Sequence, residues 1–225
     1  MITIKQKCYK KMEAWGRKAC KSEVGGLLIG YVKKGVIIVE DAIMLKQVVS
    51  MSGFAITNEA MMEFTKTADV KLLSTVIGWW HSHNTMSTFW SEIDDTCFKN
   101  ITNLNNFCFG IVIAFNKGKM DMRCRLDIKD YNKRSISIDG IETEIEESFV
   151  KKLFSNDFIT KEFNDNVVVD DDFWKPCPMC NGYGMIENNH SKKGKKLSPG
   201  VTMYEEDEEI ERGEVYTKEM RQLYG

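Results

Sequence analysis

The chain has 225 residues, of which 43% are apolar and 28% charged, a balance typical of globular rather than disordered proteins. With 31 basic and 33 acidic residues the formal net charge is −2, so the chain as a whole lacks the positive charge of a nucleic-acid-binding protein. The length predicts one full domain with a small appendage.

The lengths of the apolar runs and the spacing of the cysteines indicate in which cellular compartment the protein resides. The longest purely apolar stretch, near residues 107–115, is about half as long as a membrane span. The first 21 residues are punctuated by Lys and Arg and lack the continuous apolar segment of a secretory signal. Seven cysteines at scattered spacings do not form a disulfide framework. We therefore expect a cytoplasmic protein with reduced thiols that does not engage a membrane.

The first 56 residues combine one helical pattern with two strand patterns. Apolar residues at helical spacing predict an amphipathic helix over residues 3–19. Two apolar runs around a Lys-Lys-Gly turn predict a hairpin with strands over 25–32 and 36–40. Residues 47–56, which contain Ser, Met and Gly, are expected to form a loop.

The middle of the chain alternates helical patterns with apolar strands. Thr57 is suited to cap a helix, and a second helix is expected to begin at Ser91. Residues 72–80 are apolar and β-branched, which predicts a central buried strand. Residues 107–115 predict another buried strand, and residues 120–128 alternate between apolar and polar as in a strand with one buried face.

The last predicted elements are a short hairpin that turns at 139–140 and a helix over 149–158. The order of elements predicts an α/β or α+β fold with a mixed, mostly antiparallel sheet flanked by helices. Composition then separates a core domain, residues 1–145, from a segment with a helix and a Cys/Gly motif, residues 146–190, and a charged tail, residues 191–225.

Two histidines follow the predicted central strand and carry most of the chemical information in the sequence. Residues i and i+2 of a strand point to the same side, so His81 and His83 can present their imidazoles to one point. Two convergent imidazoles suit a divalent transition metal, above all zinc. A catalytic zinc site then needs one further protein ligand and an open position.

The predicted helix after the histidines offers candidates for the third ligand. Ser91 and Asp94 share one helix face, so Asp94 could ligate a metal while Ser91 hydrogen-bonds at its open side. Asp95 is also available, and spacing alone does not decide between the two carboxylates. Alternatively, Ser91 and Asp94 form only a capping box, which accounts for these two residues but not for the paired histidines.

This pattern resembles the metal motif of the JAMM/MPN+ metalloproteases, the JAB-domain family, in which His-x-His is followed by seven residues and then Ser-x-x-Asp. Here the two parts are His81-Ser82-His83 and Ser91-Glu92-Ile93-Asp94. The family also carries a glutamate before a Gly-rich apolar strand, and Glu23 precedes Gly25-Gly26. Taken alone, Glu23 would be interpreted as a surface charge in a loop that enters a strand.

The resemblance extends over residues 3–130 and implies a cytidine-deaminase-like JAB/MPN core that binds Zn²⁺. It implies that His81, His83 and Asp94 are the metal ligands and that Glu23 and Ser91 are catalytic. Glu23 would take a proton from the zinc-bound water and deliver it to the leaving amine, and Ser91 would donate a hydrogen bond to the developing oxyanion.

The implied substrate is a protein or peptide, cleaved at an isopeptide bond to lysine or at a peptide bond after a Gly-ended tail. A ubiquitin-like conjugate, a precursor protein, a phage structural protein and a small peptide all stay open as substrates. Asn84 stands where the family often has Pro, and the loop over 84–90 ends in aromatic residues. Neither departure affects a ligand, but both bear on how a substrate lies beside the metal. The competing interpretation is a catalytically silent MPN scaffold that only binds proteins, and the complete residue set argues against it.

A second motif lies beyond the core domain. Cys177 and Cys180 belong to a C-x-x-C-x-G-x-G unit that suits a zinc knuckle and resembles one repeat of the zinc domain of DnaJ-type chaperones. His190 is a candidate third ligand, and the fourth would come from another Cys or from a second chain, which would make a homodimer. A cytosolic dithiol without metal is the alternative. The basic cluster at 192–196 could bind nucleic acid, which the acidic segment nearby disfavours.

Overall fold

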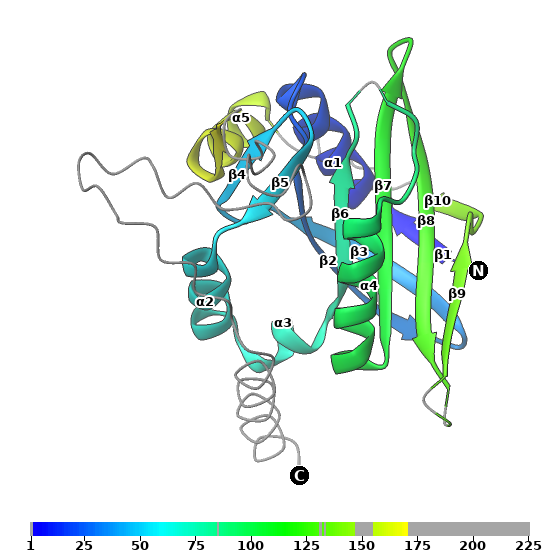
Figure 1. Cartoon of the computed structure of the whole chain (residues 1–225). Coiled ribbons are helices and arrows are strands. Elements are labelled where there is room, and N and C mark those ends of the chain that lie inside the picture. Colours follow the sequence, from blue (N-terminus) through cyan, green and yellow to red (C-terminus); the bar gives the residue numbers. More distant parts are fainter. Residues whose placement is uncertain (1, 85, 131, 133, 147–154, 171–225) are drawn as a thin grey trace, which may run out of the picture. The chain divides into compact units, whose positions relative to one another are not determined.

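A computed structural model gives the fold over residues 2–84, 86–130, 132, 134–146 and 155–170 (Figure 1). The elements in chain order are β1 (Ile2–Lys5), α1 (Gln6–Ala19), β2 (Gly25–Lys33), β3 (Val36–Ile43), β4 (Gln47–Ser50), β5 (Gly53–Ile56), α2 (Asn58–Thr67), α3 (Val70–Ser74), β6 (Val76–Ser82), α4 (Glu92–Asn105), β7 (Phe107–Asn116), β8 (Lys119–Lys129), β9 (Ser135–Asp139), β10 (Thr143–Glu146), α5 (Asn156–Asn166) and β11 (Val167–Val169).

An eight-stranded mixed sheet with the order β10-β1-β3-β2-β6-β7-β8-β9 forms the centre of the structure. Four of its neighbouring pairs are antiparallel, and the pairs β10–β1, β1–β3 and β6–β7 are parallel. A second sheet has the order β11-β4-β5. Helix α1 packs against β3 and β7, and α4 packs against β7 and β8. The predicted α+β class with a mixed sheet flanked by helices is confirmed.

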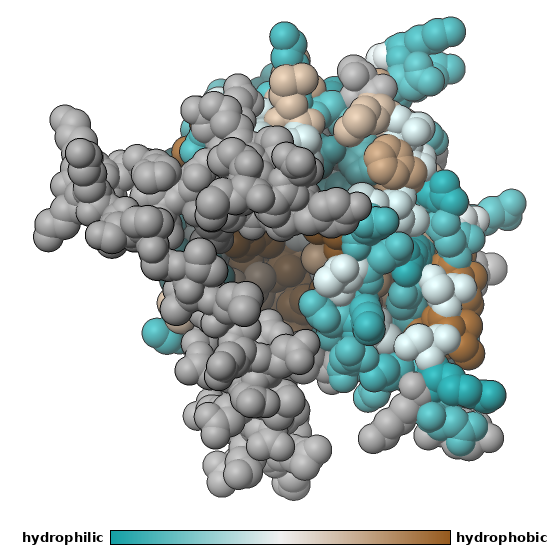
Figure 2. Space-filling view, viewed as in Figure 1, coloured by the Kyte–Doolittle hydropathy of each residue, from teal (hydrophilic) through white to brown (hydrophobic). Residues whose placement is uncertain are grey.

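The two central strands β6 and β7 are buried on both faces, which explains their nearly continuous apolar sequences. Successive residues of a strand point to opposite faces, so Trp80 packs on the α1 side while Trp79 packs on the α4 side. Trp80 stacks on Trp15 of α1 with ring centroids 5.8 Å apart. Trp79 contacts Phe98 of α4, and Figure 2 shows that the outward face of α4 is mostly hydrophilic.

Close approach of β6 to β7 requires a glycine at one position. Gly78 has φ +157°, and a Cβ added there would lie 1.7 Å from the carbonyl oxygen of Phe109 on β7. Any side chain would therefore push apart the two strands that form the middle of the sheet. The strand that carries His81 can pair this closely with β7 only because residue 78 is a glycine.

The structure confirms most of the predicted elements: the β2–β3 hairpin, the helices that follow Thr57 and Ser91, and the strands β7 and β8. Two expectations in the N-terminal half are wrong. Residues 2–5 form β1 and not the first turn of a helix, because Ile2 and Ile4 point into the core while the strand pairs in parallel with β3 and β10. Residues 47–56 are not a loop but the antiparallel hairpin β4–β5.

Three later expectations need correction. The central strand begins at Val76 instead of residue 72, because Asp69 caps the short helix α3 by accepting a hydrogen bond from the Leu72 backbone N–H. The hairpin expected at 139–140 does not form, since β9 pairs with β8 and β10 pairs with β1. The last helix begins at Asn156, and residues 149–154 of the predicted helix lie outside the described residues.

The described residues beyond 145 pack onto the same core. Helix α5 contacts α1, its Ile159 belongs to the main hydrophobic cluster, and β11 adds in parallel to β4. Within the described part of the chain, no helix has the length and apolar character that crossing a membrane requires.

Candidate metal centre

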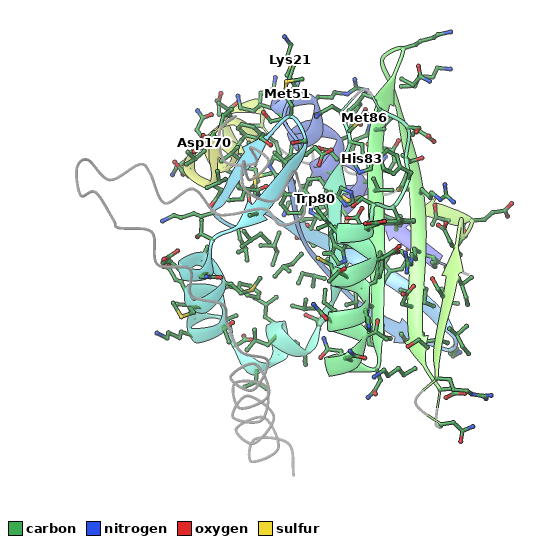
Figure 3. All side chains as sticks on the ribbon, in the orientation of Figure 1. Lys21, Met51, Trp80, His83, Met86 and Asp170 are labelled. Atoms are coloured by element: carbon green, nitrogen blue, oxygen red, sulfur yellow. The ribbon has the colours of Figure 1, made fainter. Side chains whose placement is uncertain are left out.

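The pairing of β2 with β6 brings together residues almost sixty positions apart in the sequence. The two strands are antiparallel, with Gly25 opposite His81. Extending this register by two residues places Glu23 opposite His83. Because positions two apart on a strand point to the same side, the acid and both imidazoles face the same side of the sheet. Figure 3 shows His83 at the end of β6.

The two imidazoles meet through their Nε2 atoms, which lie 2.9 Å apart. Nδ1 of His83 lies 3.1 Å from the carbonyl oxygen of Ser87 and can donate its proton there, which leaves Nε2 free as a ligand. Aromatic rings hold both imidazoles in place: Trp79 stacks on His81 at 4.8 Å, and Phe89 packs against His83 at 4.5 Å.

Asp94 is aimed at the histidines by the start of α4. Its Oδ2 accepts hydrogen bonds from the backbone N–H of Ser91 at 2.6 Å and from the Ser91 hydroxyl at 2.7 Å. Its other oxygen, Oδ1, lies 3.7 Å from Nε2 of His81. The capping box, considered above as an alternative to a ligand role, is present and is also what orients the carboxylate.

The structure distinguishes between the two candidate carboxylates. Asp94 is buried, whereas Asp95 is exposed and pairs with Arg125 of β8. Burial raises the pKa of Asp94, and the hydrogen bonds from Ser91 oppose that effect. Only Asp94 therefore joins the two histidines.

The three side chains fit a divalent transition metal. One donor atom from each of His81, His83 and Asp94 lies within 4.8 Å of the others. Two ligands of a tetrahedral zinc are about 3.3 Å apart, given Zn–N and Zn–O bonds of about 2.0–2.1 Å. The observed separations of 2.9 and 3.7 Å lie on either side of that value. Burial, and then the neighbouring His83, hold the pKa of His81 well below its usual range, so His81 is neutral and would enter such a site as a neutral ligand.

Glu23 is a buried acid in the same cavity and not a surface charge. Its side chain is 6% exposed and lines a cavity of about 220 Å³ together with His81, His83 and Asp94. Burial, and then the charge of Asp94, raise the pKa of Glu23 to about 8. A carboxyl with this pKa can hold or release a proton near neutral pH, which suits proton transfer.

Sequence reasoning missed the β4–β5 hairpin, which forms one wall of this cavity. Met51 and Phe54 of the hairpin line the cavity. Gln47, only 1% exposed, fastens the hairpin to β2: its amide accepts from Gly25 N at 3.0 Å and donates to Gly25 O at 2.9 Å and to Leu45 O at 3.0 Å. The available signal was weak, because Gln47 follows Lys46 and only the two valines after it are apolar.

The five residues singled out by the motif thus meet at one place. Glu23, His81, His83, Ser91 and Asp94 all line the same cavity. Cys177, Cys180 and His190 lie outside the described residues, so a second zinc site stays a prediction.

A family model described as prokaryotic homologues of the JAB domain matches residues 5–126, a segment that contains all five residues. The chain belongs to the JAB-domain family. This family includes JAMM metalloproteases as well as inactive members. The comparison with curated proteins found no match.

Among solved structures, this JAB-family chain is similar to the protein DSY2949 from Desulfitobacterium hafniense, whose structure was determined in solution. The two chains share 19% identity, and the alignment covers 69% of this chain and 99% of the other, with a TM-score of 0.45.

Proposed function

We propose that the chain is a JAMM-type, zinc-dependent hydrolase that cleaves a peptide or isopeptide bond in a protein or peptide substrate. The observation that supports this proposal is the buried acid Glu23 in the same cavity as the His81, His83 and Asp94 donors. A scaffold that only binds proteins gains nothing from burying this carboxyl, since burial of an acid costs free energy.

His81, His83 and Asp94 would hold the ion. When bound there, zinc supplies a water of lowered pKa, near ~7, and a Lewis acid that polarises the scissile carbonyl. The surrounding residues keep the ligands ready: Ser87 accepts the proton on Nδ1 of His83, and Ser91 holds Oδ2 of Asp94.

Glu23 would act as the proton carrier. During hydrolysis a water oxygen bonds to the carbonyl carbon and the C–N bond breaks. Glu23 accepts the proton that the water loses and delivers it to the leaving nitrogen. A cation beside Glu23 favours its ionised form and so opposes the effect of burial, which keeps the carboxylate available as a base.

Ser91 has a more constrained role than the resemblance implies. Its hydroxyl donates to Oδ2 of Asp94 and accepts from the Asp94 backbone N–H at 3.2 Å. The hydroxyl proton therefore orients a ligand, and donation to an oxyanion requires this hydrogen bond to break. We assign Ser91 to the positioning of Asp94 first.

The test compares zinc-loaded wild type with Glu23→Gln, using zinc analysis by mass spectrometry and cleavage of a model isopeptide. We expect unchanged zinc content and a loss of turnover of about 10²–10⁴-fold, the usual contribution of a general acid–base. Glu92→Gln is the matched control, since Glu92 is exposed on α4 and lies outside the lining of the cavity. Turnover retained in Glu23→Gln would remove Glu23 from the mechanism. A zinc-loaded wild type that cleaves nothing would favour the binding scaffold.

A further inference from the structure

The cavity above the candidate metal centre has an apolar rim. Four large apolar side chains line it and remain exposed: Met51 62%, Met86 44%, Phe89 41% and Ile93 49%. Met51 lies in the turn between β4 and β5, and the other three lie between β6 and the first turn of α4. Figure 3 shows Met51 and Met86 at the same end of the structure as His83, and Figure 2 shows apolar patches there among mostly hydrophilic ones.

Charge is confined to the floor of this cavity. Among the described residues that line it, Glu23 and Asp94 are the charged ones, and both are buried. The described part of the rim therefore offers no ion-pair partner to a charged substrate side chain. Single exposed apolar side chains are normal on a protein surface. Several of them gathered around one cavity mark a binding surface.

We propose that this rim selects a substrate segment with large apolar side chains on both sides of the bond to be cleaved; the existence of that bond rests on the proposed function. Successive side chains of an extended peptide point in opposite directions. A segment lying across the centre thus directs one side chain to the Met51 side and the next to the side of Met86, Phe89 and Ile93. Methionines adapt their shape, so the rim selects a class of side chain and not one residue.

This inference narrows the substrate classes left open by the sequence. A tail that consists only of glycine near the bond has no side chains to place against the four rim residues and would cover less of their apolar surface. A segment with Leu, Ile, Met or Phe would cover them and gain the free energy of apolar burial. The favoured substrate is therefore an extended apolar segment, and not a glycine tail.

The test measures binding by fluorescence anisotropy to the full-length zinc-loaded Glu23→Gln protein. The probes are three fluorescein-labelled Gly/Ser decapeptides with Leu-Leu, Asn-Asn or Gly-Gly at the centre. We expect the Leu-Leu peptide to bind at least about tenfold more tightly than the other two, the effect of burying roughly one leucine side chain. Equal affinities for the three peptides would overturn the proposal.

Variants of the rim give the matched comparison. Met51→Gln and, on the opposite side, Ile93→Gln should each reduce the preference for Leu-Leu to about threefold or less. Met62→Gln should leave it unchanged, because Met62 is 53% exposed on α2 and does not line the cavity. Equal effects of Met51→Gln and Met62→Gln would refute a role of the rim. If the Leu-Leu peptide is preferred but wild type cleaves no substrate, only the proposed hydrolase function is overturned. If wild type cleaves but the Leu-Leu peptide is not preferred, only the proposed role of the rim is overturned.

An independent observation concerns the residues between and after the histidines. Ser82 exchanges two hydrogen bonds with Val24: its Oγ accepts from Val24 N at 3.0 Å, and its backbone N–H donates to Val24 O at 2.8 Å. The Asn84 side chain donates from Nδ2 to the carbonyl oxygen of Lys21 at 2.7 Å. The side chains of Ser82 and Asn84 are buried, and they hydrogen-bond to the backbone after and before Glu23, respectively.

The geometry assigns Ser82 and Asn84 as positioning residues for Glu23 in the proposed reaction. Residues 81–84 thus serve two purposes. His81 and His83 supply the imidazoles, and Ser82 and Asn84 hold the segment that carries Glu23. Asn84 has φ +53°, a conformation closed to proline, whose ring fixes φ near −65°. Asn84 therefore replaces the usual proline with a tether to the Glu23 segment. Misplacement of a catalytic group by about 1 Å can cost about 10²-fold in rate.

Steady-state kinetics with zinc analysis test this assignment. Ser82→Ala and Asn84→Gly should lower kcat at least about tenfold while KM stays within about twofold and zinc content is unchanged. Glycine at position 84 retains access to positive φ and removes only the tether. Ser82→Thr restores a hydroxyl and should recover most of kcat. Loss of zinc, a change confined to KM, or a threonine variant no better than alanine would overturn the assignment.

Discussion

Replacement of Glu23 by glutamine should stabilise the metal-free protein, although it abolishes the proposed activity. Glu23 is 6% exposed, and its pKa is raised from 4.5 to about 8, first by burial and then by the charge of Asp94. The folded protein therefore binds this proton more tightly than the unfolded chain does. Between pH 4.5 and about 8, the contribution of Glu23 to the free energy of unfolding therefore falls as the pH rises.

The size of the effect follows from the two pKa values. Each pH unit above the unfolded pKa costs about 1.4 kcal/mol until the folded pKa is reached. At pH 7 the carboxyl thus destabilises the metal-free protein by about 3 kcal/mol, and at pH 5 by less than about 1 kcal/mol. Glutamine remains neutral at every pH and avoids this cost. The Glu23→Gln protein should therefore exceed wild type in stability by a margin that grows with pH.

Urea denaturation in the presence of EDTA, followed by tryptophan fluorescence at pH 5, 6, 7 and 8, measures this margin. The comparison between variants cancels the titration of His81 and the other groups that both proteins share. Glu92→Gln, at an exposed position, should show no such growth. A margin that stays constant from pH 5 to pH 8, or a Glu23→Gln protein less stable than wild type at pH 8, would refute the reasoning.

Three further predictions test the ligand set and the fold. His81→Ala should lose most bound zinc, whereas Asp95→Asn should retain it; mass-spectrometric zinc contents that are equal in the two variants would contradict the ligand assignment. Gly78→Ala should destabilise the protein by more than about 3 kcal/mol because of its backbone clash, while Gly35→Ala, in an open turn, should cost about 1 kcal/mol, as chemical denaturation can show. Gln47→Ala, which leaves two buried backbone groups of β2 without a partner, should cost about 2–4 kcal/mol and increase proteolysis of the β4–β5 hairpin; unchanged stability would show that the hairpin is held by other contacts.

Much of the candidate metal centre could be predicted from the sequence because its proposed ligands lie close together in the chain. His81 and His83 share a strand end, and Ser91 and Asp94 share a helix start, so local periodicity brings each pair together. The position of Glu23 depends instead on the register of β2 against β6, a long-range pairing that no local pattern specifies. Its link to the histidines therefore depended on family resemblance.

The missed elements are short strands with partners that are distant in the sequence. β1 directly precedes α1 with no side-chain cap to mark the boundary, so its apolar residues merged with the helical pattern. β4 and β5 are four residues each, and the buried Gln47 made the first of them look polar. β10 departs from the expected hairpin because it joins β1, more than 130 residues away, in parallel.

The carboxyl of Asp94 serves two structures at once. One oxygen caps the first turn of α4 while the other points to His81. An ion held at this candidate site would therefore be thermodynamically linked to the integrity of this turn. Ordering of the helix start would strengthen ion binding, and a bound ion would protect the backbone amides of the turn from hydrogen exchange.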